Sequence, residues 1–125
     1  MIHVVRLALA AVLWAVFLCP AHARDPDGRY INSPHRDWYQ TRELTEAAQK
    51  RFGFKSCCAH SDVVITKFRP TASGDDGWEY VDATGHWARV PDDIIHHGEG
   101  TPPGEPVLFA VGGRPTCFYP GTAGG

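Results

Sequence analysis

The chain has 125 residues and a formal net charge of −2, from 12 Lys and Arg and 14 Asp and Glu side chains. This length allows one ordinary domain, and the near-neutral charge excludes a strongly basic nucleic-acid-binding protein of the usual kind. Because 43% of the residues are hydrophobic, wholesale disorder is also excluded, and we expect a small globular protein.

Residues 1–23 have the pattern of a secretory signal peptide. Arg6 precedes an unbroken apolar run over 7–18, and the small residues Ala21 and Ala23 follow at the positions that signal peptidases recognise. The run is too short for a membrane-spanning helix, which needs about 20 apolar residues. We therefore expect cleavage after Ala23 and a periplasmic or secreted mature chain without a transmembrane segment.

The residues that follow predict an arm and a helix. Residues 24–33 are polar and rich in turn-forming types, so we expect an extended arm. Ser33 and Pro34 suit the cap and the first position of a helix, and no Gly or further Pro interrupts the chain before Phe52. The sequence predicts a helix up to Phe52, with a break allowed near Thr41, which is itself an acceptable cap.

The rest of the chain predicts short strands. Five runs are β-branched or aromatic and are bounded by turn-forming residues, over 63–68, 78–81, 86–90, 107–111 and 116–119. One helical turn is expected over 92–95, and a disordered tail over 122–125. The predicted fold class is α+β, a single domain over 34–121 in which an N-terminal helix precedes a small antiparallel five-stranded sheet or an SH3-like barrel.

Cleavage after Ala23 would leave three cysteines, Cys57, Cys58 and Cys117. Exported proteins meet oxidising conditions, so Cys117 can form a disulfide with either Cys57 or Cys58 if the first and last strands are neighbours. Closing such a loop of about 60 residues would contribute roughly 4 kcal/mol in the chain-entropy model. One thiol is left over, and it permits a disulfide-linked homodimer.

Cys57, Cys58 and His60 place two thiols and an imidazole within four residues, and His96 and His97 add imidazoles on a later stretch. Thiolate and imidazole ligands suit zinc or copper, so the first three residues are a candidate metal site. The paired spacings typical of zinc sites are missing from the sequence. We therefore expect no cofactor, and we keep a thiol- or metal-handling protein as the alternative.

Trp78, Tyr80 and Trp87 lie on the predicted central hairpin and are the candidate ligand-binding residues. Alternation along a strand places Trp78 and Tyr80 on one face, and Trp87 can join them from the neighbouring strand. Such a platform would stack against a sugar or an extended peptide. The competing interpretation is that the three rings fill the core of a small domain.

Catalytic motifs are not recognisable in the sequence, which has no Gly-x-Ser-x-Gly and no Gly-rich phosphate loop. Two pairs of adjacent acids, Asp75–Asp76 and Asp92–Asp93, are interpreted as a solvated turn and the start of a helix, where Asp is a favoured cap. Triads can also assemble from distant residues. Nothing in this sequence points to one, and we expect a protein that is not an enzyme.

Several motifs resemble those of a group of small exported proteobacterial proteins of unassigned function. They are Asp25-Pro26-Asp27-Gly28-Arg29-Tyr30, Ser33-Pro34, Trp38, Cys57-Cys58, Gly85-His86-Trp87, Val90-Pro91-Asp92, Cys117-Phe118 and Pro120-Gly121. The most specific feature is the adjacent Cys pair with one late Cys. In similar sequences Asp-Gly commonly follows the pair, whereas this chain has Ser61-Asp62-Val63 there. The resemblance implies an exported single domain and transfers no catalytic residue.

These features together predict an exported periplasmic protein that acts as a non-enzymatic binding or envelope-associated module and is stabilised by a disulfide. The alternative, a thiol- or metal-handling protein, would use Cys57, Cys58 and His60. The sequence identifies neither a ligand nor a partner.

Overall fold

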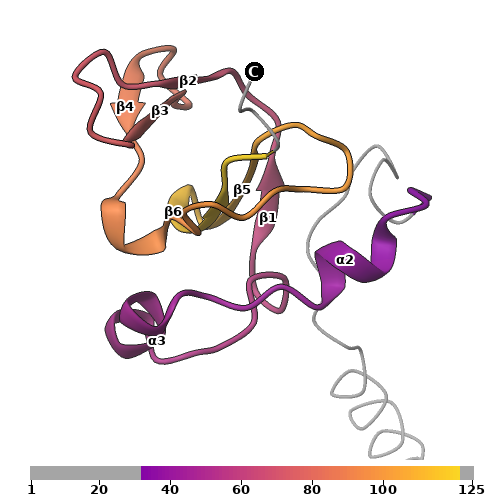
Figure 1. Cartoon of the computed structure of the whole chain (residues 1–125). Coiled ribbons are helices and arrows are strands. Elements are labelled where there is room, and N and C mark those ends of the chain that lie inside the picture. Colours follow the sequence, from indigo (N-terminus) through magenta and orange to yellow (C-terminus); the bar gives the residue numbers. More distant parts are fainter. Residues whose placement is uncertain (1–31, 122–125) are drawn as a thin grey trace, which may run out of the picture.

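The computed structural model describes residues 32–121 (Figure 1). The predicted signal peptide, the arm up to residue 31 and the tail from residue 122 lie outside the described residues. Within the described part, no helix is long and apolar enough to cross a membrane.

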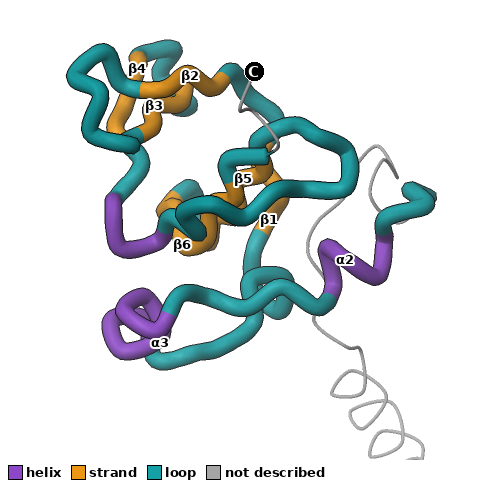
Figure 2. The backbone as a smooth tube through the Cα atoms, viewed as in Figure 1, coloured by secondary structure: helices purple, strands orange, loops and turns teal. Residues whose placement is uncertain are grey.

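The fold class is α+β and mostly β, with short elements joined by long loops (Figure 2). In chain order the described elements are α2 (Arg36–Gln40), α3 (Glu46–Phe52), β1 (Asp62–Val64), β2 (Phe68–Pro70), β3 (Trp78–Val81), β4 (Trp87–Arg89), the 3-10 turn η1 (Asp92–Ile94), β5 (Val107–Val111) and β6 (Arg114–Tyr119). The predicted turn over 92–95 is confirmed as η1.

Two short helices, α2 and α3, stand where the sequence predicts one long N-terminal helix. The segment between them pairs with a later loop through an isolated bridge from Glu43 to Ser56. A helix cannot make this bridge, since its backbone groups bond within the helix. The break adjoins Thr41 as predicted, but the cap of α3 is Thr45, whose side chain accepts the backbone N–H of Ala48.

The six strands within residues 32–121 form two antiparallel sheets of three strands, ordered β1–β5–β6 and β2–β3–β4. The predicted single five-stranded sheet is not formed, and the structure does not show an SH3-like barrel. The difference arises in the run 63–68, which divides into β1 and β2. Val63 pairs with Phe109 on β5, whereas Phe68 pairs with Tyr80 on β3.

The chain between β1 and β2 is held against β3 where it passes from one sheet to the other. The Thr66 hydroxyl donates to the Val81 carbonyl at 2.6 Å, and the Val81 N–H donates to the Lys67 carbonyl at 3.1 Å. These bonds satisfy backbone groups that a regular strand would pair within a single sheet.

One hydrophobic cluster joins both sheets through Phe118 of β6, which is fully buried. Its ring centroid lies 5.6 Å from that of Phe68 and 5.5 Å from that of Trp78, both on the other sheet. Figure 1 shows the sheet β2–β3–β4 on one side of β6 and α3 on the other. The strand β6 is therefore the centre of the domain.

A buried disulfide joins Cys57, in the loop after α3, to Cys117 of β6. The two cysteines are 60 positions apart, and neither side chain is exposed. Between the two pairings that the sequence allows, the structure has Cys57 as the partner of Cys117. Cys58 is a half-buried free cysteine.

Candidate functional site: a groove beside Trp78

The three aromatic residues predicted as a ligand platform lie on opposite faces of the sheet β2–β3–β4. Trp78 and Tyr80 face inward and pack against the core. Trp87 pairs with Val81, which directly follows Tyr80 and therefore lies on the other face of the sheet. Because paired residues share a face, Trp87 points outward. The residue is 39% exposed, and the Arg69 guanidinium lies over its ring at 4.0 Å from the centroid. The structure thus brings Trp78 and Tyr80 together and keeps Trp87 apart.

A groove of about 370 Å³ opens beside Trp78. Its walls come from the loop between β2 and β3, from the turn after η1 and from the residue after β6. Its lining includes the side chains of Pro70, Asp76, Trp78, His97 and Pro120, which are apolar, aromatic or ionisable. This volume lies near the lower end of the range for small-molecule pockets.

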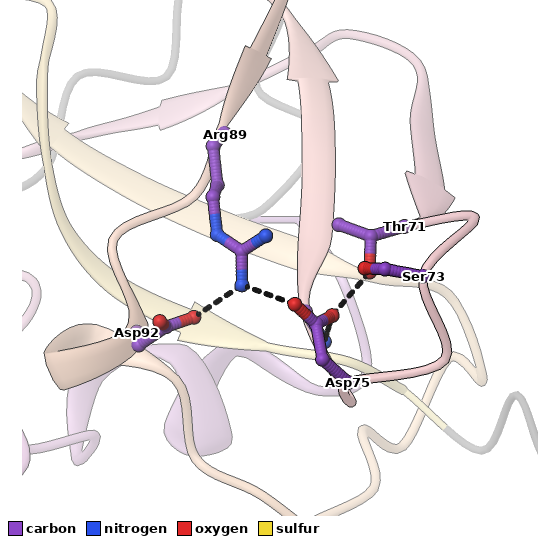
Figure 3. A network of polar contacts seen from close by, with 6 residues as sticks. Thr71, Ser73, Asp75, Arg89 and Asp92 are labelled. Atoms are coloured by element: carbon purple, nitrogen blue, oxygen red, sulfur yellow. Dashed lines mark hydrogen bonds and ion pairs between the residues drawn. The ribbon is translucent and has the colours of Figure 1, made fainter.

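One wall of the groove is fixed by the polar network of Figure 3. The Asp75 carboxylate accepts hydrogen bonds from the Thr71 hydroxyl, from the Gly77 N–H at 3.0 Å and from the Arg89 guanidinium at 3.0 Å. The same guanidinium nitrogen donates to Asp92 at 3.1 Å. The network thus ties the loop between β2 and β3 to β4 and to η1.

Hydrogen bonding keeps this network ionised. The Thr71 hydroxyl, the Arg89 guanidinium and the Gly77 N–H together hold the pKa of Asp75 well below its usual range. The two carboxylates of Asp75 and Asp92 in turn raise the pKa of Arg89. The loop therefore keeps its ion pair throughout the neutral and mildly acidic range.

The opposite wall rests on a stacked pair of rings, His96 and Tyr119. Their centroids are 4.0 Å apart and their planes differ by 6°. The His96 Nδ1 atom lies 3.1 Å from the Glu99 carboxylate. Because His97 and Pro120 follow these two residues directly in the chain, the stack positions the groove wall that they form.

Burial dominates the ionisation of this stack. It lowers the pKa of His96, although the Glu99 carboxylate acts in the opposite direction, and it raises the pKa of Tyr119 to about 12. The His96 Nε2 atom is buried and has no hydrogen-bond partner among the described residues. The Glu43 carbonyl beside it accepts instead from the Tyr119 hydroxyl at 3.1 Å.

The predicted metal set Cys57, Cys58 and His60 loses one donor, because the Cys57 sulfur is bonded to Cys117. Of the other two, Cys58 is half-buried, and His60 is exposed with its ring edge-on to Phe54 at 6.1 Å. Over residues 32–121, no group of three or more His, Cys, Asp or Glu residues could hold a metal ion.

The sequence predicts Trp78 as a ligand-binding residue, but it does not predict the other residues that line the groove. Pro70, Asp76, His97 and Pro120 come from loops that only the fold brings together. Their one sequence signal is that they lie in Gly- and Pro-rich stretches beside predicted strands, where binding residues often occur. Comparison of the chain with family models, with curated proteins and with solved structures found no match.

Proposed function

We propose that this protein is an exported, non-enzymatic binding module, stabilised by one disulfide, that holds its ligand in the groove beside Trp78. The observation that carries the proposal is how the groove is built. Trp78 lines the groove together with residues of two other segments, and each of these segments is held by its own set of contacts. The Asp75–Arg89 pair fixes one wall, and the His96–Tyr119 stack fixes the other. A preformed site of this kind loses little freedom when it binds.

Two features support the export part of the proposal. The pattern over 1–23 is that of a signal peptide. The Cys57–Cys117 disulfide is of a kind that persists in oxidising compartments and is rare in the cytosol. The resemblance to small exported proteobacterial proteins is in line with both.

Binding is tested with the ¹⁵N-labelled mature chain, residues 24–125, titrated separately with three probes. They are an arginine-containing tripeptide amide, chitotriose and spermidine. At least one probe should shift the amide signals of residues 71–78, 97 and 98. A Trp87→Ala variant, altered on the outer face of the sheet, should give the same shifts. Shifts confined to other surfaces, or none with any probe, would contradict the proposal.

Export is tested by the intact mass of protein recovered from the periplasm. The mass of the monomer fraction should correspond to cleavage after Ala23 and one disulfide, and alkylation of that fraction without reduction should modify only Cys58. An uncleaved chain, or three alkylated thiols, would count against the proposal. A stoichiometric bound metal would favour the thiol- or metal-handling alternative.

A further inference from the structure

We infer that the groove beside Trp78 binds the side chain of an arginine or a lysine carried by a basic peptide segment. The inference rests on the proposed function, since it names the ligand class of the same groove. Three observations carry it: the charge of the lining, the apolar surfaces beside that charge, and the exposed backbone of the groove.

The groove has one unpaired carboxylate. Asp76 lines it, and among the described residues Asp76 has neither an ion-pair partner nor a hydrogen-bond partner. The neighbouring Asp75 is paired with Arg89, and no Lys or Arg side chain lines the groove. A cation is therefore attracted to the groove and an anion is repelled from it.

The backbone holds Asp76 in place. Its φ of 58° lies in the left-handed region, which non-glycine residues seldom adopt but which Asp tolerates better than most. Its two neighbours are fixed, because the Asp75 side chain accepts the Gly77 N–H and pairs with Arg89. The position of Asp76 is thus set before any ligand arrives.

The other groove surfaces suit a long side chain with an apolar stem. Pro70, Trp78 and Pro120 are apolar, and the methylene groups of Arg or Lys pack well on such surfaces while the charged head stays polar. An indole ring also attracts a guanidinium or ammonium group through its π face. A compact amine would leave these apolar surfaces uncovered.

Gly74 and Gly98 open the groove to a peptide main chain. Both residues line it, and a Cβ built on either one would meet no atom within 4 Å. Their backbones are therefore exposed to the groove, and a peptide main chain can approach them closely. This room beyond the charged head favours a peptide over a free polyamine.

The test compares an acetylated Gly-Arg-Gly amide with its Gly-citrulline-Gly counterpart, which has nearly the same shape but no charge. Binding to the mature protein is followed by tryptophan fluorescence and by amide shifts. The arginine peptide should bind about three- to fivefold more tightly, because Asp76 is exposed and an ion pair at an exposed site contributes little. Added salt should weaken its binding.

Asp76→Asn removes the charge and keeps a residue type that tolerates the same φ, so its arginine affinity should fall to that of the citrulline peptide. Asp76→Gly should lower the arginine affinity to the same extent. Agreement between the two variants would show that the loss does not come from a folding defect in Asp76→Asn. Glu46→Gln, which removes an exposed acid on α3 paired with Lys50, is the matched control and should bind like the wild type.

The outcomes separate the inference from the proposed function. If both peptides bind the groove equally, or if Asp76→Asn changes nothing, the inferred cation preference is overturned while groove binding stands. Tighter groove binding of spermidine than of the peptide overturns the peptide as ligand. If no probe shifts the groove signals, the proposed function fails together with the inference.

Discussion

Gly77 lies where the loop between β2 and β3 meets the guanidinium of Arg89. A Cβ at this position would stand 2.6 Å from the Arg89 Nη2 atom and 2.8 Å from the Asp75 Oδ1 atom. Both atoms belong to the ends of flexible side chains, so a methyl group at this position would require Arg89 and Asp75 to shift. Because Gly77 has no side chain, the contact between Arg89 and Asp75 that fixes one wall of the groove can form.

Gly77→Ala should therefore lower the thermal midpoint of the protein comprising residues 24–125 by a few degrees and weaken ligand binding in the groove. The reason is the displacement of Arg89 from Asp75. Differential scanning calorimetry measures the midpoint. Ala72→Ser, a change at an exposed position of the same loop, is the control and should change neither quantity. A Gly77→Ala protein as stable as the wild type would show that the loop does not depend on this contact.

The half-buried His96 ring predicts a stability that depends on pH. Burial lowers its pKa in the folded protein, with Arg42 acting in the same direction and the Glu99 carboxylate acting against them. The unfolded chain then binds more protons than the folded one just below the ordinary histidine pKa of about 6.5. The stabilisation is complete above that pH and is lost as the pH falls below it.

We expect the free energy of unfolding to decrease from pH 7 to pH 5, and we expect His96→Gln to flatten that decrease. Urea unfolding at several pH values measures both. Equal pH dependence in the two proteins would mean that His96 does not cause the effect.

At the scale of elements, the structure differs from the sequence prediction where one predicted strand divides and pairs with strands of two different sheets. Val63 and Phe68 belong to a single β-branched and aromatic run, yet they lie in different sheets. Periodicity reports which residues favour a strand, not which strand they will join. The predicted strands 78–81 and 107–111 match β3 and β5, because each is bounded by turn residues and pairs within one sheet.

The candidate site was less predictable than the strands. Alternation correctly placed Trp78 and Tyr80 on one face, because it depends only on neighbouring residues. The side to which Trp87 points depends on the register between β3 and β4, and Val81 is its partner. The other residues of the groove come from irregular loops, whose packing no local pattern specifies.

The start of α3 gives a prediction at this scale. The Thr45 hydroxyl accepts the Ala48 N–H and also donates to the Asp93 carbonyl, so it caps α3 and attaches the helix to η1. Thr45→Ala should reduce the free energy of unfolding by about 1 kcal/mol, as measured by urea denaturation. Thr45→Ser keeps the hydroxyl and should recover most of the loss. Equal stability of the alanine and serine variants would contradict the capping role.

For the molecule as a whole, the disulfide links two segments that are 60 positions apart. Replacing Cys57 and Cys117 together by Ser should reduce the free energy of unfolding by roughly 4 kcal/mol, since about 60 residues lose their closed loop in the unfolded chain. Denaturant unfolding under oxidising conditions measures the loss. Cys58→Ser keeps the bridge and should stay close to the wild type. A double variant as stable as the wild type would contradict this prediction.

Cys58 has a free thiol, so the predicted disulfide-linked homodimer could form through it. The dimer itself remains a prediction. A dimer band on a non-reducing gel should disappear in Cys58→Ser and in reduced wild-type protein. A band that persists in the variant would exclude this cysteine as the link.

The central place of β6 has a consequence for the timing of folding. A chain that crosses a membrane from its N-terminus presents Cys57 and Cys58 long before Cys117, and Phe118 and Tyr119 arrive with that last cysteine. Until then the Phe118 ring, which packs between the two sheets, is absent. During the same time the thiols of Cys57 and Cys58 are exposed to oxidation. If the chain is exported as we propose, its early thiols must therefore stay unpaired, or be re-paired, until the final strand has emerged.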